Sequence, residues 1–314
     1  MCGIGAFQIV GNECEPAKVA RVLLRLLEVR GKDASGVAWH DGKGGTFVRK
    51  NNCAGKELAK VLKDNVGNTG VVHTRWATLG SPKVEANNHP IDVGGVVGVH
   101  NGHCTNHIDL ISKCEGYARN GQVDSEAIFA LIAHGPKKQL LRTRLAQVQG
   151  NAALLWLRSF DKNNRLHAAR LTSSPLWFGQ TKLGSVIFAS TEAILLETAK
   201  RCGLVFEYTH EMAEGSYVRV QDGVLSEMQT INLPKPKFVL PKHDYTKTST
   251  YYKPAKNNKE FDLAEPLLLE FDDDDFVDEF DYDLEQWEHD LYGTTLRQSL
   301  DKQFGMGAYK RDRF

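Results

Sequence analysis

The residue with the clearest chemical potential is Cys2, which directly follows the initiator methionine. Removal of that methionine is expected before a small residue such as cysteine, and it would leave Cys2 with a free α-amino group. The α-amine, with a pKa of about 7.7–8.0, can accept the thiol proton close to neutral pH. Cys2 would then hold a nucleophile and a base in one residue. Taken alone, however, a cysteine at the second position is more often an accident of sequence.

Polar side chains gather in four further segments, each at the end of a predicted strand or next to a predicted helix. These segments are 30–36 (RGKDASG), 73–80 (HTRWATLG), 100–102 (HNG) and 123–126 (VDSE). Catalytic groups are commonly presented on loops that a rigid scaffold positions. The four segments are therefore candidates for the groups that surround the Cys2 thiol.

The elements that position these segments are alternating short strands and helices over residues 1–232. Short apolar runs predict the strands, and apolar residues three and four positions apart predict the helices. Strands are expected at 3–10, 36–40, 46–50, 70–74, 96–100, 152–159, 165–171, 185–189, 217–220 and 224–231, and helices at 15–30, 54–64, 124–134, 137–148 and 192–201. Because strands cluster at both ends with helices between them, the pattern predicts an α+β fold with mainly antiparallel sheets.

The ordered set of motifs resembles the glutaminase domain of class II, N-terminal-nucleophile glutamine amidotransferases. It is most similar to the glucosamine-6-phosphate synthase branch, and the matching pieces are Cys2-Gly3-Ile4, Arg30-Gly31 with Asp33 and Gly36, His73–Gly80, Asn87–Pro90, His100–Gly102 and Asp124–Glu126. A lone HNG triplet is a weak signal, whereas these pieces in this order and spacing are specific. The resemblance covers about residues 1–232, and it implies a four-layer αββα sandwich, the N-terminal nucleophile hydrolase fold.

The resemblance implies that the catalytic residues are Cys2, Asn101 and Gly102. Attack of the Cys2 thiolate on an amide forms a tetrahedral oxyanion, which needs preorganised hydrogen-bond donors. The side-chain amide of Asn101 and the backbone N–H of Gly102 would supply them. The alternative for this Asn-Gly pair is a type I′ turn, for which it is a favoured dipeptide.

The resemblance also implies how the zwitterionic end of glutamine is bound. Arg75 would grip the α-carboxylate in a bidentate manner, with a further hydrogen bond from Thr78. Asp124 would take the α-ammonium group, although plain helix capping is its alternative role. Trp76 would lie over the pocket, or else pack in the core.

Two supporting residues complete the expected site. Arg30 would brace the loop of the nucleophile, and His89 would hold the pocket wall or serve as a structural, hydrogen-bonded histidine. Leu79 stands where the family motif has histidine, which puts substrate affinity or coupling in doubt rather than catalysis. No metal and no organic cofactor is expected, because the histidines lack the spacing of a closed zinc site.

The charge of the chain is segregated although its formal sum is zero. We expect three parts: an amidotransferase domain over 1–232, a Pro/Lys-rich linker over 233–259, and an acidic, disordered tail over 260–314. Residues 260–290 hold fifteen Asp and Glu and no Lys or Arg. The tail is either a solvated segment without a specific role or a segment that docks on the basic surface of the domain itself or on a partner protein. The modest positive charge of the domain argues against nucleic-acid binding.

The six cysteines include no CxxC pair, and the sequence has neither a signal peptide nor an apolar run of membrane-spanning length, which favours a cytoplasmic protein. The resemblance implies an enzyme that hydrolyses the side-chain amide of L-glutamine through a γ-glutamyl thioester on Cys2. Because the residues after 233 are too few for the isomerase part of full-length synthases, we expect the released ammonia to reach an acceptor on a partner protein. The alternatives are another N-terminal-nucleophile amide hydrolase and a catalytically silent regulatory or binding module.

Overall fold

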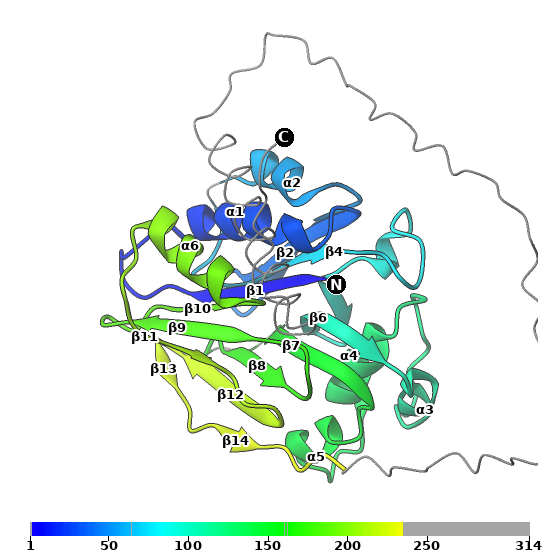
Figure 1. Cartoon of the computed structure of the whole chain (residues 1–314). Coiled ribbons are helices and arrows are strands. Elements are labelled where there is room, and N and C mark those ends of the chain that lie inside the picture. Colours follow the sequence, from blue (N-terminus) through cyan, green and yellow to red (C-terminus); the bar gives the residue numbers. More distant parts are fainter. Residues whose placement is uncertain (1, 64, 160, 162, 235–314) are drawn as a thin grey trace, which may run out of the picture. The chain divides into compact units, whose positions relative to one another are not determined.

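Two antiparallel sheets lie face to face in the computed structural model, which describes residues 2–234 except 64, 160 and 162 (Figure 1). The first sheet has the strand order β11-β9-β10-β1-β4-β2-β3, formed by β1 (Gly3–Gln8), β2 (Ala34–His40), β3 (Thr46–Asn51), β4 (Thr69–Arg75), β9 (Trp177–Thr181), β10 (Val186–Ala189) and β11 (Phe206–Glu211). The second has the order β13-β12-β8-β7-β6-β5 with β14 beside β12, formed by β5 (Ile91–Val93), β6 (Val96–Cys104), β7 (Gly150–Arg158), β8 (Leu166–Arg170), β12 (Ser216–Gln221), β13 (Val224–Leu225) and β14 (Gln229–Thr230).

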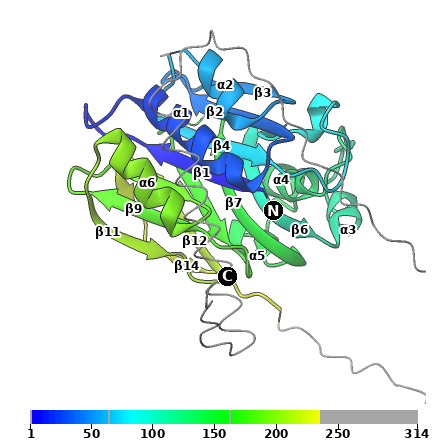
Figure 2. The ribbon, with the colours of Figure 1, turned by 45° about the horizontal axis from the view of Figure 1, so that its top comes forward.

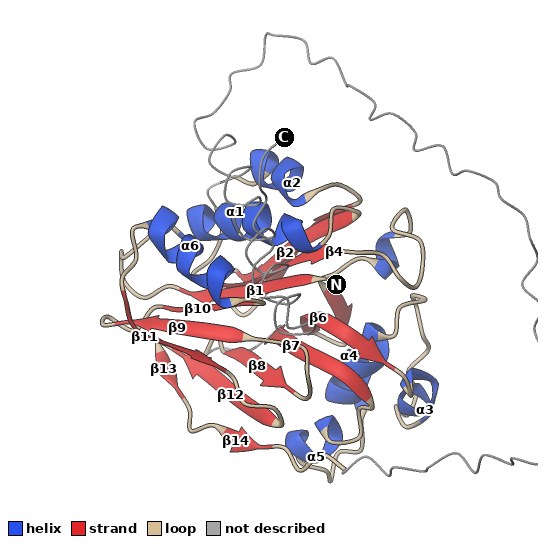
Figure 3. Cartoon of the chain, in the orientation of Figure 1, coloured by secondary structure: helices blue, strands red, loops and turns tan. Residues whose placement is uncertain are grey.

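Helices cover the outer faces of both sheets, as Figures 2 and 3 show. On the first sheet lie α1 (Pro16–Leu27), α2 (Gly55–Val61) and α6 (Glu192–Cys202). On the second sheet α4 (Ser125–His134) packs against β5 and β6, and α3 (His107–Ser112) and α5 (Leu141–Leu145) pack against α4. The predicted α+β fold with four αββα layers is therefore confirmed.

Apolar side chains fill the space between the sheets and the space under α4. Alternation along each strand sends every second side chain to the inner face, and these inward residues include Ile4, Ala6 and Val71 from the first sheet and Val97 and Leu155 from the second. Under α4 a second cluster joins Ile128, Phe129 and Leu131 to Trp156 and Tyr217. The strands that carry the candidate site residues contribute side chains to these clusters.

Several elements differ from the expectations. The strand expected at 96–100 continues to Cys104, and the helix expected over 137–148 is confined to Leu141–Leu145. Strands β9 and β11 were not predicted. The expected hairpin at Asp222-Gly223 is present, with both residues at positive φ. Most of the expected linker and all of the expected acidic tail lie outside the described residues. Within the described part of the chain, no helix is long and apolar enough to cross a membrane.

Candidate active site

Cys2 directly precedes β1, the strand that lies between β4 and β10 in the first sheet. Because Gly3 pairs with Thr74 in an antiparallel register, the start of β1 lies beside the end of β4. Beyond the end of β10, the Ser190 hydroxyl accepts a hydrogen bond from the backbone N–H of Ile4 (2.8 Å) and donates one to the carbonyl of the same residue (3.1 Å). The backbone next to Cys2 is thus held on both sides.

Two contacts hold Cys2 itself. The Nε of Arg30 donates a hydrogen bond to the Cys2 carbonyl (3.0 Å), and the Cys2 thiol lies 3.7 Å from the carbonyl oxygen of Trp76, to which it donates. Burial raises the pKa of the Cys2 thiol, and the positive charges of Arg75 and Arg30 only partly offset this. A thiol of raised pKa needs a nearby proton acceptor before it can attack an electrophile.

Asn101 and Gly102 lie inside β6, where they pair with Ala153 and Ala152 of β7. The alternative of a turn at this Asn-Gly pair is therefore wrong. Asn101 is 1% exposed, and its Nδ2 has no hydrogen-bond partner among the described residues. Gly102 has a φ of 144°, and a Cβ there would lie 1.9 Å from the carbonyl oxygen of Asn151, so only glycine fits.

The start of β1 and strand β6 approach each other across the two sheets, as both ribbon views show (Figures 1 and 2). Native structures leave few buried donors without a partner, since each costs about 1–3 kcal/mol. The Asn101 amide, which lies on a strand in contact with β1, is such a donor. Its position and its lack of a partner are those of a group that is kept free for a ligand atom.

Asp124 precedes α4, but its side chain makes no capping hydrogen bond, so the capping alternative is wrong. Its Oδ2 accepts the backbone N–H of Cys104 (2.5 Å) and lies 3.4 Å from Nδ1 of His103. The carboxylate is therefore tied to the end of β6, two residues beyond Gly102.

Arg75 ends β4 and is 3% exposed. Its Nη1 donates to Oδ1 of Asn88 (2.8 Å), and its Nη2 donates to the carbonyls of Leu79 (2.6 Å) and Gly80 (2.7 Å). The guanidinium thus organises the loop 79–88. Among the hydrogen bonds within the described residues, the Nε hydrogen and one Nη1 hydrogen are not used. These two are the donors that Arg75 has left for a ligand.

The loop after β4 carries the more exposed candidates. Trp76 is 58% exposed, so the alternative of core packing is wrong for this residue. Thr78 is exposed, and Leu79 is 38% exposed while its carbonyl binds Arg75. The carboxylate of Asp33 accepts the backbone N–H of Ala77 (2.6 Å) and fixes the start of this loop. Exposed side chains over a fixed backbone suit a pocket rim.

Buried histidines lie beneath the loops. The rings of His73 and His89 stack at 4.2 Å, and none of their ring nitrogens has a hydrogen-bond partner among the described residues. The alternative that His89 is a structural, hydrogen-bonded histidine is therefore wrong. Burial, with a contribution from Arg75, lowers the pKa of His73 to about 3, so this ring is neutral at physiological pH. Sequence reasoning gave no role to His73 or to Ser190.

No metal centre is apparent in the described residues, since no three His, Cys, Asp or Glu side chains there are grouped to hold an ion. The candidate residues instead offer amide, guanidinium and carboxylate groups. Such a set suits an organic zwitterion and a developing oxyanion.

Comparison with known proteins gives a consistent result. Residues 73–197 match the family described as "Glutamine amidotransferase domain". The chain is 36% identical over 208 residues to glutamine–fructose-6-phosphate aminotransferase (isomerizing) of Aquifex aeolicus, which covers 64% of this chain and 34% of that protein. It is 32% identical over 247 residues to the protein of the same name from Pyrococcus horikoshii, with 73% and 39% covered. The chain thus spans well under half the length of these relatives.

Solved structures agree with the fold. Glutamine phosphoribosylpyrophosphate amidotransferase from B. subtilis superposes with a TM-score of 0.61 at 18% identity, over 74% of this chain and 50% of that one. An identity this low shows a common fold only. The motifs, the two-sheet architecture and the sequence relatives agree, and the chain belongs to the class II glutamine amidotransferases.

Proposed function

We propose that residues 1–232 hydrolyse the side-chain amide of L-glutamine, with Cys2 as the nucleophile. The observation that carries this proposal is the buried Nδ2 of Asn101, which has no partner in the described residues and lies next to Gly102 in the strand that faces the start of β1. An oxyanion that forms on the substrate carbonyl would accept hydrogen bonds from this amide and from the Gly102 N–H.

The reaction starts with proton transfer from the Cys2 thiol to the α-amine that removal of Met1 exposes. The Cys2 thiolate attacks the side-chain carbonyl carbon, and collapse of the oxyanion expels ammonia, which takes the proton back from the α-amine. A γ-glutamyl thioester remains on Cys2. Water then attacks the thioester, glutamate leaves, and the thiol is restored. Burial raises the pKa of the Cys2 thiol, so this scheme requires a base beside the thiol.

The ends of glutamine have complementary partners in the proposed pocket. Arg75 would meet the α-carboxylate through its remaining N–H groups, and Asp124 the α-ammonium group. Thr78 and Trp76 would close the rim, Arg30 would brace Cys2, and His89 would support the wall. The presence of one cationic and one anionic candidate, Arg75 and Asp124, supports an α-amino acid substrate over other amides.

The acceptor of the ammonia is proposed to be bound by a partner protein. The named activity of the relatives, transfer of an amino group to fructose 6-phosphate, belongs to proteins of which this chain matches about a third to two fifths. The acidic segment 260–290 is proposed as the docking element, since its fifteen carboxylates suit a basic partner surface.

The experiment is intact-protein mass spectrometry after incubation with an electrophilic glutamine analogue. We expect loss of the Met1 mass and one covalent adduct in the native chain, and no adduct in Cys2→Ala. Cys53→Ala is the matched control, since Cys53 is also only partly buried, and it is expected to keep the adduct. A retained Met1, or a processed chain that takes no adduct, would refute the proposal and favour a catalytically silent module.

A further inference from the structure

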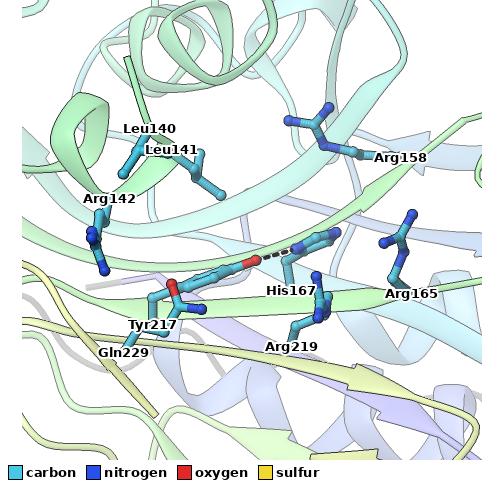
Figure 4. A pocket seen from close by; sticks show the side chains of 9 residues that line it. All are labelled: Leu140, Leu141, Arg142, Arg158, Arg165, His167, Tyr217, Arg219 and Gln229. Carbon is cyan, nitrogen blue, oxygen red and sulfur yellow. Dashed lines mark hydrogen bonds between the residues drawn. The ribbon is translucent and has the colours of Figure 1, made fainter. Parts of the chain in front are cut away.

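A pocket of about 550 Å³ lies on the second sheet, in a region that the reaction does not use (Figure 4). Its polar lining comes from seven side chains: Arg142, Arg158, Arg165, Arg219, His167, Tyr217 and Gln229. We refer to these residues as the arginine pocket. No carboxylate is among the residues that line it.

Strand register explains why the arginines converge. His167 of β8 pairs with Trp156 of β7 on one side and with Arg219 of β12 on the other. Side chains two residues apart on a strand share a face, so Arg158 and Arg165 extend from the same face as Trp156 and His167. The end of β7, the residue before β8, and β12 therefore each contribute one guanidinium group to the same patch of the second sheet. These groups belong to Arg158, Arg165 and Arg219.

The charge of the arginine pocket is largely uncompensated. Arg165 forms a bidentate pair with Asp161 (2.7 and 3.0 Å). For Arg142, Arg158 and Arg219, the described residues provide no ion pair. Like charges in one pocket repel each other, and a bound anion would offset this repulsion.

His167 provides a second, independent observation. It is 5% exposed, and its Nδ1 lies 2.8 Å from the Tyr217 hydroxyl. Its Nε2 has no hydrogen-bond partner among the described residues, and Figure 4 shows this edge of the ring directed to the side where Arg158 and Arg165 lie. The ring stacks on Trp156 at 5.0 Å, which fixes its orientation. A buried donor held in place without a partner, among guanidinium groups, suits a bound acceptor.

We propose that the arginine pocket binds the phosphate group of a small molecule. Guanidinium groups match phosphate oxygens in bidentate geometry, and an N–H at His167 Nε2 would donate to one oxygen. A neutral His167 is consistent with this, because burial and the nearby arginines lower its pKa to about 3. Leu140 and Leu141 also line the pocket, so the ligand would carry an apolar or ring portion beside its phosphate.

The arginine pocket is separate from the candidate active site. Along β6 and β7, Gly102 pairs with Ala152 whereas Arg158 pairs with Val96, six positions further. Six residues of strand span about 20 Å. A ligand in the arginine pocket would therefore leave the Cys2 pocket free, and its binding does not depend on whether Cys2 is active.

The test is isothermal titration calorimetry of the full chain at low ionic strength with inorganic phosphate, pyrophosphate and phenyl phosphate. Low salt limits screening of the charges. The variants are Arg158→Ala and Arg219→Ala, and the control is Arg49→Ala, which removes the same charge from β3 of the other sheet. Near-ultraviolet circular dichroism checks that each variant is folded, and Arg219→Lys tests whether the fork or the charge alone is needed.

We expect saturable binding to the native chain that weakens about tenfold in each pocket variant and less than twofold in Arg49→Ala, since only the pocket variants remove a charge-assisted hydrogen bond to the phosphate. The ¹⁵N resonance of His167 Nε2, assigned by its loss in His167→Gln, should shift on addition of ligand. Tighter binding of phenyl phosphate than of inorganic phosphate would identify an organic phosphate as the ligand, and the reverse would identify the free anion. Absence of saturable binding, or equal weakening in all three alanine variants, would overturn the proposal.

Discussion

The Asn101→Ala variant is expected to separate an effect on catalysis from an effect on stability. The Nδ2 of Asn101 is buried and has no partner in the described residues. Its removal therefore breaks no hydrogen bond among the described residues, and it relieves an unpaired donor that costs about 1–3 kcal/mol. This gain offsets the packing that is lost, so we expect the free energy of unfolding to stay within about 1 kcal/mol of the native value.

Activity should respond very differently to this substitution. One oxyanion donor contributes a factor of about 10²–10³ in kcat, or about 2.7–4 kcal/mol. The assay is steady-state glutamate release from glutamine by the full chain, together with urea unfolding of the same preparation. We expect kcat to fall by that factor while the KM for glutamine changes little.

Asn106→Ala is the matched control and should give the opposite pattern. The side chain of Asn106 donates to the carbonyl of Gln147 (2.9 Å) and accepts the backbone N–H of Gln149 (3.0 Å). Loss of these two bonds should lower the free energy of unfolding by about 2 kcal/mol and leave kcat close to native. If Asn101→Ala keeps kcat within tenfold of native, or loses as much stability as Asn106→Ala, the reasoning on the oxyanion donor is refuted.

Three further outcomes are expected. Gly102→Ala should destabilise the fold and abolish glutaminase activity, because its Cβ would lie 1.9 Å from the Asn151 carbonyl oxygen, and thermal unfolding with the same assay checks this. Asp124→Asn should raise the KM for glutamine by about 10- to 100-fold with a smaller effect on kcat, as initial rates over a range of glutamine concentrations will show. His73 and His167 have folded-state pKa values of about 3, below the unfolded value of about 6.5, so their stabilising contribution is complete above pH 6.5 and is lost towards pH 3. Urea unfolding at several pH values should show a decline of up to about 1.4 kcal/mol per pH unit for each ring, and a flat profile across this range would contradict the assignment of two neutral histidines.

The sequence predicts elements that form clear apolar runs, but burial alone does not separate the predicted elements from the missed ones. Strand β9 was missed although three of its five residues are buried, and β3 was predicted although none of its residues is buried. Strands β1, β4 and β7 are apolar runs that lie in the cores, so their pattern is visible. Strand β11 is an edge strand with no buried residue, so no face of it needs apolar side chains. The helix expected over 137–148 shrinks to α5, whose preceding Leu140 is 60% exposed although it fits a helical apolar pattern.

The candidate site also contains some residues that the sequence identifies and others that it does not. The sequence motifs identify Cys2, Arg75 and Asn101 as candidates, because the types of these residues and their order along the chain are distinctive. The sequence does not identify Ser190, because a serine after a strand forms no distinctive pattern. Its hydrogen bonds to the backbone of Ile4 depend on the pairing of β10 with β1. The bonds of Arg75 to the carbonyls of its own loop depend likewise on how that loop folds back.

The clamp of Ser190 on Ile4 has a consequence for the timing of activity during synthesis. Strand β1, which directly follows Cys2, pairs with β4 on one side and with β10 on the other. The pairing with β10 needs residues 186–189, which are made late in the synthesis of the domain. A ribosome that adds about 5–20 residues per second needs roughly 10–40 s to reach that point. Until then the N-terminal cysteine lacks its fixed neighbours, and contacts this distant in sequence form slowly. The backbone beside Cys2 therefore acquires its full set of neighbours only late in synthesis.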